Sequence, residues 1–517
     1  MSKNKIYLLT AFLEGLSVMT VELAGAQMMS SFYGSSLYVW CSVLGITLLG
    51  LTCGYFLGGK LSEKFPSEFT LYFILFPASG LIVLMPLIGE YTMTIALNLN
   101  LIEGIIRSGM VLLFPPLVLL GMICPILIKQ IAKEVTVSGK SAGTIFSIST
   151  VGGIVAALSL GFYVIPNFGV SKSVFIVGGI LGLYSLVYSL YYRKMGHVFV
   201  TIIVIGFVLL SIRQRYTVTT KSSKFNVIYS SEGILGQIRV VDDITDVRTL
   251  LVNNIPQTKM HKTGRSLWPY VYRIATYASV KPQGSRVLLA GVGGGNLANE
   301  MHVLGFDVEM VDIDSRMSMI AQNYFNAVKE IDTHIDDFRH FVKTTAKRYD
   351  IIIIDLSAGE DIPSNVFTIE AFQELKMVLA NEGVVFIHYL STLVGDGMMA
   401  VESIGNTIQA AGFDVRMLNT FPQIDRVSEL IFVASEQPLD FSALSYRIDP
   451  EIPNRLNFPL TNNIYLKDVV FENGLILTDD QPILDVIQQK STMLMRRNNI
   501  KRVIKPLIED NIDILLN

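Results

Sequence analysis

Residues 286–296 read RVLLAGVGGGN and decide the fold of the C-terminal part of this chain. The apolar run RVLLA is typical of a buried strand, and glycines after it let the backbone turn sharply and approach a ligand. The next apolar run, DVEMVDI (307–313), places Asp312 21 residues after Gly291. This spacing predicts a nucleoside site, in which a helix N-terminus faces the ligand and a carboxylate binds the ribose hydroxyls. It leaves open whether the ligand is a dinucleotide or an S-adenosyl sulfonium.

Strand and helix patterns alternate on both sides of this stretch. Further strands are predicted at 350–356, 383–389, 413–418 and 430–434, and helices at 295–304, 315–327, 368–380 and 397–411. Such alternation predicts a doubly wound α/β domain with a mostly parallel sheet. Residues 225–258 instead alternate apolar and polar side chains around turn signals, which predicts a small antiparallel sheet.

The charged residues are distributed unevenly along the 517 residues. Residues 1–215 contain 13 of the 41 Lys and Arg residues, 7 of the 44 Asp and Glu residues, and no Asp. A single soluble globule is therefore excluded, and a helical membrane part followed by a soluble part is expected. The net charge of −3 offers no basic face to nucleic acid, so no nucleic-acid partner is expected. The histidines show no metal-ligand spacing, and no metal is expected.

Seven segments are long and apolar enough to be considered as spans: 6–30, 36–59, 69–89, 106–128, 142–166, 171–192 and 197–212. The second contains Gly50, Gly54 and Gly58 at helical spacing, which predicts close approach of another helix. In the first, Glu14 and Glu22 are eight residues apart and share a helix face. These acids indicate either a polar cavity or hydrogen-bonded structural carboxylates.

The loop charges and the expected chemistry give different orientations. Short loops on the N-terminal side hold most of the Lys and Arg residues, which places the N-terminus in the cytosol. Seven crossings would then leave the C-terminal part outside. A nucleoside substrate argues for a cytosolic domain, and we follow that argument, in a multi-pass protein of a bacterial-type plasma (inner) membrane.

Several blocks of the sequence resemble the spermidine synthase (aminopropyltransferase) family, and more closely its membrane-fused bacterial branch. The resemblance rests on VNNIPQ (252–257), LLAGVGGGNLANE (288–300), VDID (311–314), HIDDF (334–338), YDIIIIDLS (349–357) and TDDQP (478–482), and on blocks at 12–38 and 48–61. It implies a methyltransferase-like Rossmann fold preceded by the small sheet. The expected domains are a transmembrane helical domain of about seven spans (1–215), a small β-sheet subdomain (216–262) and a spermidine synthase-like Rossmann domain with a C-terminal tail (263–517).

The resemblance also implies roles for individual residues. Gln257 would contact the nucleoside, Asp312 would hold the ribose, and Asp336, with Asp337, would reach the adenine amino group. Asp355 would end its strand at the catalytic mouth. The floor under the methionine-derived chain would be formed by the loop glycines, namely Gly291, Gly293, Gly294 and Gly295.

The sequence departs from the family pattern at several positions, one of which is Asn253-Asn254 in place of the family's Asp-Gly before the Gln. The family has an Asp, which grips the amine of decarboxylated S-adenosylmethionine, where this chain has Gly294. The second acid of the family's paired motif is replaced by Ala358, for which Glu360 or Asp361 would substitute. The family's Tyr falls near Pro269, and Tyr270 and Tyr272 are the replacements expected to position the aminoalkyl chain.

These departures favour cleavage of S-adenosylmethionine at its aminoalkyl side, with release of methylthioadenosine in a lyase or cyclase reaction. The first alternative is aminopropyl transfer from decarboxylated S-adenosylmethionine to putrescine. A methyltransferase and a nucleoside-sensing transporter are further alternatives. The expected partners are a small-molecule substrate and the lipid bilayer, and a homodimer is left open.

Overall fold

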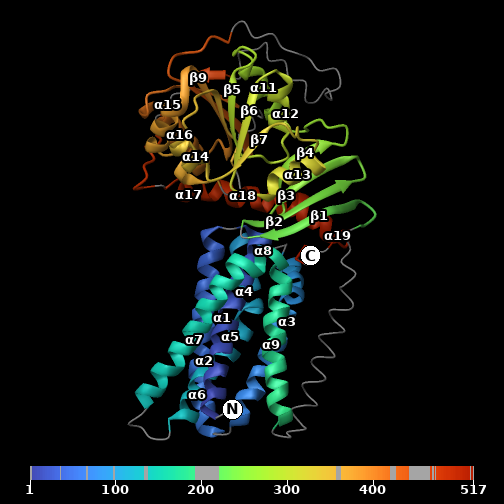
Figure 1. Ribbon diagram of the computed structural model, residues 1–517, viewed down its shortest axis with the longest axis vertical. Coiled ribbons are helices and arrows are strands. Elements are labelled where there is room, and N and C mark those ends of the chain that lie inside the picture. The colour runs from blue at the N-terminus through green and yellow to red at the C-terminus, as the bar shows by residue number, and fades with distance from the viewer. Residues whose placement is uncertain are drawn as a thin grey trace. The chain divides into compact units, whose positions relative to one another are not determined.

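Our computed structural model describes most of the chain (Figure 1). The described residues are 3–34, 36–65, 68–96, 99–132, 138–191, 221–233, 235–356, 362–419, 427–441, 466–468, 471, 473–481, 483–512 and 514–515. The chain divides into two compact units, the first comprising Met1–Ile238 with Ile500–Asn517 and the second Arg239–Asn499. The sequence analysis assigned residues 500–517 to the C-terminal domain instead. They join the first unit because Ile500, Ile504 and Leu515 are buried in its hydrophobic core.

The first unit is built mainly from long apolar helices. Their bounds are α1 (Lys3–Tyr33), α2 (Leu37–Lys64), α3 (Glu68–Ile95), α4 (Leu101–Leu112), α5 (Phe114–Gly121), α6 (Ile123–Ile131), α7 (Ser138–Ser159), α8 (Ile165–Phe168) and α9 (Val170–Tyr191). Among the described residues, six helical segments are long and apolar enough to cross a membrane. They overlap the first six predicted spans, whereas the seventh, 197–212, lies outside the described residues.

Glycines let the helices of this unit approach closely, as predicted for Gly50, Gly54 and Gly58. A Cβ atom added at Gly54 would lie 2.5 Å from the carbonyl oxygen of Val118, and one at Gly58 would lie 2.5 Å from that of Met122. A similar contact joins α1 and α7, where a Cβ at Gly152 would lie 2.1 Å from the Phe12 carbonyl oxygen. Small residues at these positions therefore allow backbone-to-backbone packing.

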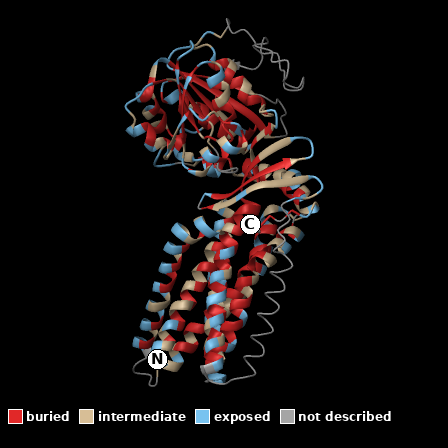
Figure 2. Cartoon of the chain, turned by 45° about the vertical axis from the view of Figure 1, so that its right-hand side comes forward, coloured by how far each residue is buried: buried red, intermediate tan, exposed pale blue. Residues whose placement is uncertain are grey.

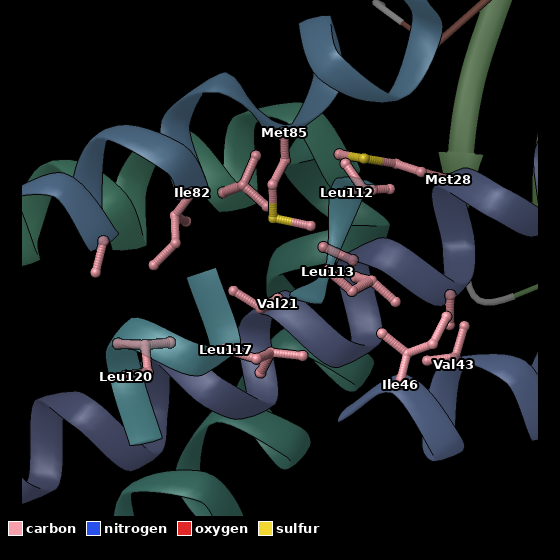
Figure 3. Close-up of a cluster of buried hydrophobic side chains, with 14 of the residues drawn as sticks. Val21, Met28, Val43, Ile46, Ile82, Met85, Leu112, Leu113, Leu117 and Leu120 are labelled. Carbon is pink, nitrogen blue, oxygen red and sulfur yellow. The ribbon is translucent and has the colours of Figure 1, made fainter. Parts of the chain in front are cut away.

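Apolar side chains from α1 to α5 fill the centre of the helical unit. Figure 3 shows Val21, Met28, Val43, Ile46, Ile82, Met85, Leu112, Leu113, Leu117 and Leu120 gathered there. Other large apolar side chains face outward, among them Leu48, Phe56 and Phe162, and Figure 2 shows exposed stretches along these helices. An apolar exterior is what a helix in contact with lipid requires.

Glu14 is a buried structural acid in this unit. Its carboxylate accepts hydrogen bonds from the Ser149 hydroxyl at 2.6 Å and the Cys124 thiol at 3.5 Å. Glu14 is only 2% exposed. Of the two roles open from the sequence, these contacts favour a hydrogen-bonded acid that joins α1 to α6 and α7.

A four-stranded sheet precedes the Rossmann-like part, in the order β1-β2-β3-β4. Its strands are β1 (Phe225–Gly233), β2 (Gly236–Asp243), β3 (Val247–Val252) and β4 (Ile255–His261). Strands β3 and β4 are antiparallel and are joined by Asn253 and Asn254, with φ of +48° and +61°. Asparagine tolerates this left-handed backbone better than most residues, so it suits a two-residue hairpin turn. The turn directs Gln257 and Thr258 along β4.

The second unit contains an eight-stranded sheet in the order β12-β10-β11-β9-β8-β5-β6-β7. The strands are β5 (Arg286–Ala290), β6 (Asp307–Asp312), β7 (Asp332–Ile335), β8 (Tyr349–Ile354), β9 (Leu379–Thr392), β10 (Asp414–Asn419), β11 (Val427–Ser435) and β12 (Leu466–Asp468). Pairing is parallel from β9 through β8, β5 and β6 to β7, and antiparallel from β9 to β12. The central strands are buried, as Figure 2 shows in red.

Helices accompany these strands. They are α11 (Pro269–Ala278), α12 (Asn296–Val303), α13 (Arg316–Tyr324), α14 (Phe338–Thr344), α15 (Ile369–Val378), α16 (Asp396–Ala410), α17 (Leu484–Ile487), α18 (Gln489–Asn499) and, in the first unit, α19 (Lys505–Glu509). The predicted α/β architecture is confirmed. No ranges were predicted for α11, α14 or β7, and the last two have only seven and four residues, too few to show a clear period.

Candidate active site

Strand register gathers the candidate residues at one edge of the sheet. Ala290 of β5 pairs with Val311 of β6 and with Ile354 of β8, and Ile354 pairs in turn with Ile387 of β9. The residues that follow these four are Gly291, Asp312, Asp355 and His388. They lie beside one another at the carboxyl ends of parallel strands, where α/β folds bind ligands.

The glycine loop after β5 has a backbone that other residues would not adopt easily. Gly291 has a φ of +93°, and a Cβ there would lie 2.2 Å from the Asp355 carbonyl oxygen. Gly295 has a φ of +75° and is the N-cap of α12. The loop therefore brings bare backbone and a helix N-terminus to the carboxyl edge of the sheet, an arrangement suited to a nucleoside-containing ligand.

Position 294 needs glycine because there is no room for a side chain there, and not because of its backbone conformation. Its N–H donates to the Thr258 hydroxyl at 2.9 Å. A Cβ at this position would lie 2.6 Å from the Thr258 methyl group and 3.1 Å from the Phe325 ring. An acid in place of Gly294 would thus displace Thr258 or Phe325, so the departure from the family pattern is built into the surrounding packing.

Asp312 is held in place by two backbone donors. Its carboxylate accepts hydrogen bonds from the N–H groups of Val292 at 2.9 Å and Asp314 at 2.8 Å. Burial raises the pKa of Asp312 above its usual value, although both backbone donors act in the opposite direction. The two contacts fix the carboxylate beside the glycine loop, where the sequence predicted a ribose contact.

Asn296 begins α12 directly after the glycine loop. The residue is 8% exposed, and neither its amide oxygen nor its amide nitrogen has a hydrogen-bonding partner among the described residues. Leaving such a group unpaired costs about 1–3 kcal/mol. Asn296 is therefore a candidate ligand contact to which the sequence analysis assigned no role.

Asp355, whose side chain is 22% exposed, lies at the centre of a polar cluster. The Tyr270 hydroxyl donates to one carboxylate oxygen at 2.7 Å, and His388 Nδ1 donates to the other at 2.8 Å. His388 Nε2 lies 3.6 Å from the carboxylate of Glu429 on β11. We call these four residues, Tyr270, Asp355, His388 and Glu429, the Asp355 cluster.

The electrostatics of the cluster favour a charged histidine. Burial opposes the imidazolium, but Asp355 and Glu429 together raise the pKa of His388 from 6.5 to about 9. Burial, and then the Asp355 carboxylate, raise the pKa of the Tyr270 hydroxyl well above its usual value. At neutral pH, a neutral phenol and an imidazolium therefore donate to the Asp355 side chain.

Two other predicted site residues have different contacts. The Tyr272 hydroxyl donates to the Ser266 carbonyl oxygen at 3.1 Å, so Tyr272 does not share the Asp355 contact of Tyr270. Two residues apart on α11, their side chains point in different directions. Asp337 is the N-cap of α14, where its carboxylate accepts from the His340 N–H at 3.0 Å.

The remaining predicted residues are placed as follows. The Asp336 carboxylate lies 2.8 Å from His340 Nδ1, and its backbone N–H donates to the Asp312 carbonyl oxygen, next to the predicted ribose site. Gln257 lies half-buried on β4. Glu360 and Asp361, the predicted stand-ins for Ala358, lie outside the described residues.

Sequence reasoning assigned no site role to Thr258 or Glu429, and for His388 it favoured a core or rim histidine over a pocket-lining one. His388 carried a usable signal, because it follows Ile387 on β9 just as Asp355 follows Ile354, the residue that pairs with Ile387. Glu429 carried no such signal in the sequence, since it comes close to His388 only because β11 pairs with β9 in an antiparallel arrangement. Thr258 likewise reaches Gly294 from a strand 36 residues away in sequence.

Part of the chain is similar to known proteins. Residues 273–436 match the spermine/spermidine synthase domain. The polyamine aminopropyltransferase of Vibrio vulnificus is 31% identical over 135 residues, which cover 25% of this chain and 45% of that protein. Polyamine aminopropyltransferase 2 of Bacillus anthracis is 30% identical over 149 residues, covering 26% and 40%. The chain thus spans less than half the length of these curated relatives, and the resemblance stated from the motifs is confirmed for its C-terminal part.

Solved structures are also similar to part of this chain. The spermidine synthase of Thermotoga maritima aligns with 47% of this chain and 81% of its own, at 20% identity and a TM-score of 0.36.

Proposed function

We propose that this chain, which carries a spermine/spermidine synthase domain, is a membrane-integrated aminopropyltransferase-like enzyme. Its donor is an S-adenosyl sulfonium, favoured in the decarboxylated form, and its acceptor is an amine. The observation that carries the proposal is the alignment of Gly291, Asp312 and Asp355 at neighbouring strand ends. This row supports the proposal because the residues proposed to bind the nucleoside lie beside a carboxylate with two fixed donors.

The reaction joins an amine to the carbon that the donor sulfur activates. The lone pair of the amine nitrogen forms the new C–N bond, and the C–S bond breaks with its electron pair going to sulfur. Methylthioadenosine leaves as a neutral molecule, and the nitrogen loses a proton to Asp355 and then to solvent. The protein contributes mainly orientation, since the sulfonium is already a good leaving group.

Different residues of this chain have different roles in the proposed reaction. Asp312 and the glycine loop hold the nucleoside, and Asn296 offers an additional amide at the N-terminus of α12. Asp355 orients the amine, while Tyr270 and His388 keep its carboxylate in one position. Glu360 and Asp361 remain proposed acids near the acceptor, together with Asp336 and Gln257 near the nucleoside.

Gly294 favours a second candidate function, cleavage of ordinary S-adenosylmethionine without an acceptor. The space of an acid at position 294 is taken by Thr258 and Phe325, so no carboxylate there repels a donor carboxylate. That donor carboxylate would attack the same carbon, closing a lactone and releasing methylthioadenosine. The donor's amine keeps its proton in this reaction, and no second substrate is needed.

One experiment separates these functions. Full-length protein purified in detergent is incubated with S-adenosylmethionine alone, or with decarboxylated S-adenosylmethionine and an amine, and the products are identified by mass. Methylthioadenosine only in the second reaction supports amine transfer, and its release in the first supports cyclisation. S-adenosylhomocysteine would instead indicate methyl transfer. No product, with ligand-dependent conformational change, would favour a sensor or transporter. Asp312→Ala and Asp355→Asn are the variants expected to abolish turnover.

The proposed orientation places the second unit in the cytosol, where S-adenosylmethionine is made. Six crossings by the described helices would return the chain to the side of its N-terminus. The loop charges also favour a cytosolic N-terminus, so six crossings remove the conflict that seven create. Protease treatment of right-side-out vesicles tests this arrangement, because a cytosolic second unit is protected until the membrane is opened.

A further inference from the structure

The order of the strands determines which way a nucleoside would lie in the proposed reaction. Asp355, Gly291, Asp312 and Asp336 lie at the carboxyl ends of β8, β5, β6 and β7, which are neighbours in this order. A ribose carries its base and its 5′ substituent on opposite sides of the ring. If Asp312 holds the hydroxyls and the sulfonium arm extends to Asp355, the base extends in the other direction, toward the end of β7.

Asp336 is the acid at the end of β7. Ile335 pairs with Asp312 on the parallel strand β6, and the Asp336 N–H donates to the Asp312 carbonyl oxygen at 3.2 Å. Neighbouring strands lie about 4.8 Å apart, so Asp336 follows the proposed ribose contact by one strand spacing. A carboxylate only accepts hydrogen bonds. It therefore binds the 6-amino group of adenine and repels the 6-oxo group of hypoxanthine.

His340 holds the Asp336 carboxylate from the first turn of α14. Its Nδ1 lies 2.9 Å from one carboxylate oxygen and 2.8 Å from the other, and it must donate because a carboxylate offers only lone pairs. The Asp337 N–H also donates to the Asp336 carboxylate, at 2.8 Å. The Asp337 side chain in turn accepts from the His340 N–H at 3.0 Å, which fixes the start of the helix that carries the imidazole.

The Asp336 carboxylate remains available to a ligand. Its side chain is 31% exposed. An ionised carboxylate has about four acceptor positions, and the donors from His340 and Asp337 use about half of them. The arrangement is thus an oriented carboxylate with acceptor positions left for a donor on the base.

We propose that His340 is a positioning residue for base recognition, whose imidazole holds Asp336 ready to accept from the amino group of adenine. The inference rests on the proposed function and deepens it by assigning the preference for an aminopurine to this pair. His340 acts through Asp336, because a carboxylate that can rotate away must be ordered when the ligand binds, and that ordering costs affinity. The His340 side chain is 64% exposed, so the pair contributes little to stability and its effect belongs to binding.

The decisive variants change the donor that faces Asp336. His340→Leu removes this donor, whereas His340→Asn restores one, because the amide nitrogen of Asn is as many bonds from the backbone as Nδ1 of His. Asp336→Asn replaces one acceptor oxygen by a donor that suits a 6-oxo group. His302→Leu is the matched control, because His302 is an exposed histidine on α12.

Base preference is measured on full-length protein in detergent as the ratio of the dissociation constants of methylthioinosine and methylthioadenosine, by calorimetry. We expect the wild type to prefer methylthioadenosine about tenfold or more, since a 6-oxo group loses a hydrogen bond to a charged acceptor. His340→Leu should reduce this preference about threefold or more. His340→Asn and His302→Leu should keep it within about twofold. In an Asp336→Asn background, His340→Leu should have almost no further effect, because the two residues act as one unit.

The outcomes separate this inference from the proposed function. A preference that falls in His340→Leu and returns in His340→Asn supports the inference even if no methylthioadenosine is released from a donor. Release of methylthioadenosine from decarboxylated S-adenosylmethionine, with an unchanged preference in His340→Leu, supports amine transfer and overturns the role of His340. Equal losses in His340→Leu and His340→Asn overturn it as well, as does a wild type that binds both nucleosides equally or binds neither.

Discussion

The imidazole of His388 stacks on the phenol ring of Tyr270, and both donate to the carboxylate of Asp355. The two rings come from a helix and a strand more than a hundred residues apart in sequence. Stacking fixes their planes and the hydrogen bonds fix their donor atoms, so each side chain limits the movement of the other. The two rings therefore hold the Asp355 carboxylate in one orientation.

The charge of His388 predicts how stability depends on pH. Its folded pKa of about 9 lies above the ordinary 6.5, so charged His388 stabilises the fold fully below about pH 6.5, and this contribution is lost as pH rises through about 9. The contribution is on the order of 3 kcal/mol. Thermal unfolding in detergent should show a larger fall in midpoint between about pH 6 and about pH 10 for wild type than for His388→Gln. Equal falls would contradict a charged His388.

Gly294 and Thr258 should be energetically coupled. Gly294→Ala places a methyl 2.6 Å from the Thr258 methyl group and should destabilise the protein by about 1–3 kcal/mol. Thr258→Ser removes that methyl but keeps the hydroxyl that accepts from the Gly294 N–H. The double variant should recover part of the loss in a double-mutant cycle of unfolding free energies. Strict additivity would show that the clash is not with Thr258.

Replacing Asn296 with an apolar residue should stabilise the ligand-free protein and weaken ligand binding. Asn296→Leu removes a buried amide that has no partner among the described residues, so the thermal midpoint of the ligand-free protein should rise. Methylthioadenosine binding, measured by calorimetry, should weaken by about tenfold because one ligand contact is lost.

Asn299 on the same helix is the matched control. It donates to the Asn326 carbonyl oxygen and accepts from the Val328 N–H, so Asn299→Leu should lower the thermal midpoint. If both variants lower it equally, the Asn296 amide has a partner in the ligand-free protein.

Asp312→Asn should weaken methylthioadenosine binding at least about tenfold with little change in fold. The amide keeps the shape of the side chain, but its nitrogen cannot accept the N–H of Val292 or Asp314. Calorimetry measures the affinity, and a near-UV spectrum checks the fold. Unchanged affinity would remove Asp312 from the nucleoside site.

Gly58 and Gly59 provide a matched pair in the helical unit. A Cβ at Gly58 would meet the Met122 backbone at 2.5 Å, whereas one at Gly59 would meet nothing within 4 Å. Gly58→Ala should therefore lower the thermal midpoint in detergent by several degrees, because backbone cannot move aside as a flexible side chain can. Gly59→Ala should be neutral or slightly stabilising, since alanine favours a helix. Similar effects of the two substitutions would contradict close packing at Gly58.

Local patterns were sufficient to predict much of this protein. The partition of charge predicted the helical unit, and the apolar runs ending in Gly291, Asp312 and Asp355 predicted the central parallel strands. The spacing of Gly50, Gly54 and Gly58 predicted the close helix contact. Each of these signals is contained in a single segment or in the order of neighbouring segments, and local periodicity preserves it.

Only the tertiary structure decided which side chains meet. It separated Tyr270 from Tyr272, added Glu429 to His388 through an antiparallel strand, and filled the space beside Gly294 with Thr258 and Phe325. It also joined residues 500–515 to the helical core. Such contacts depend on strand register and helix rotation, which are set by packing across segments far apart in sequence. The sequence thus determined the glycine loop and the acids at the strand ends, whereas packing across distant segments decided which side chains surround them.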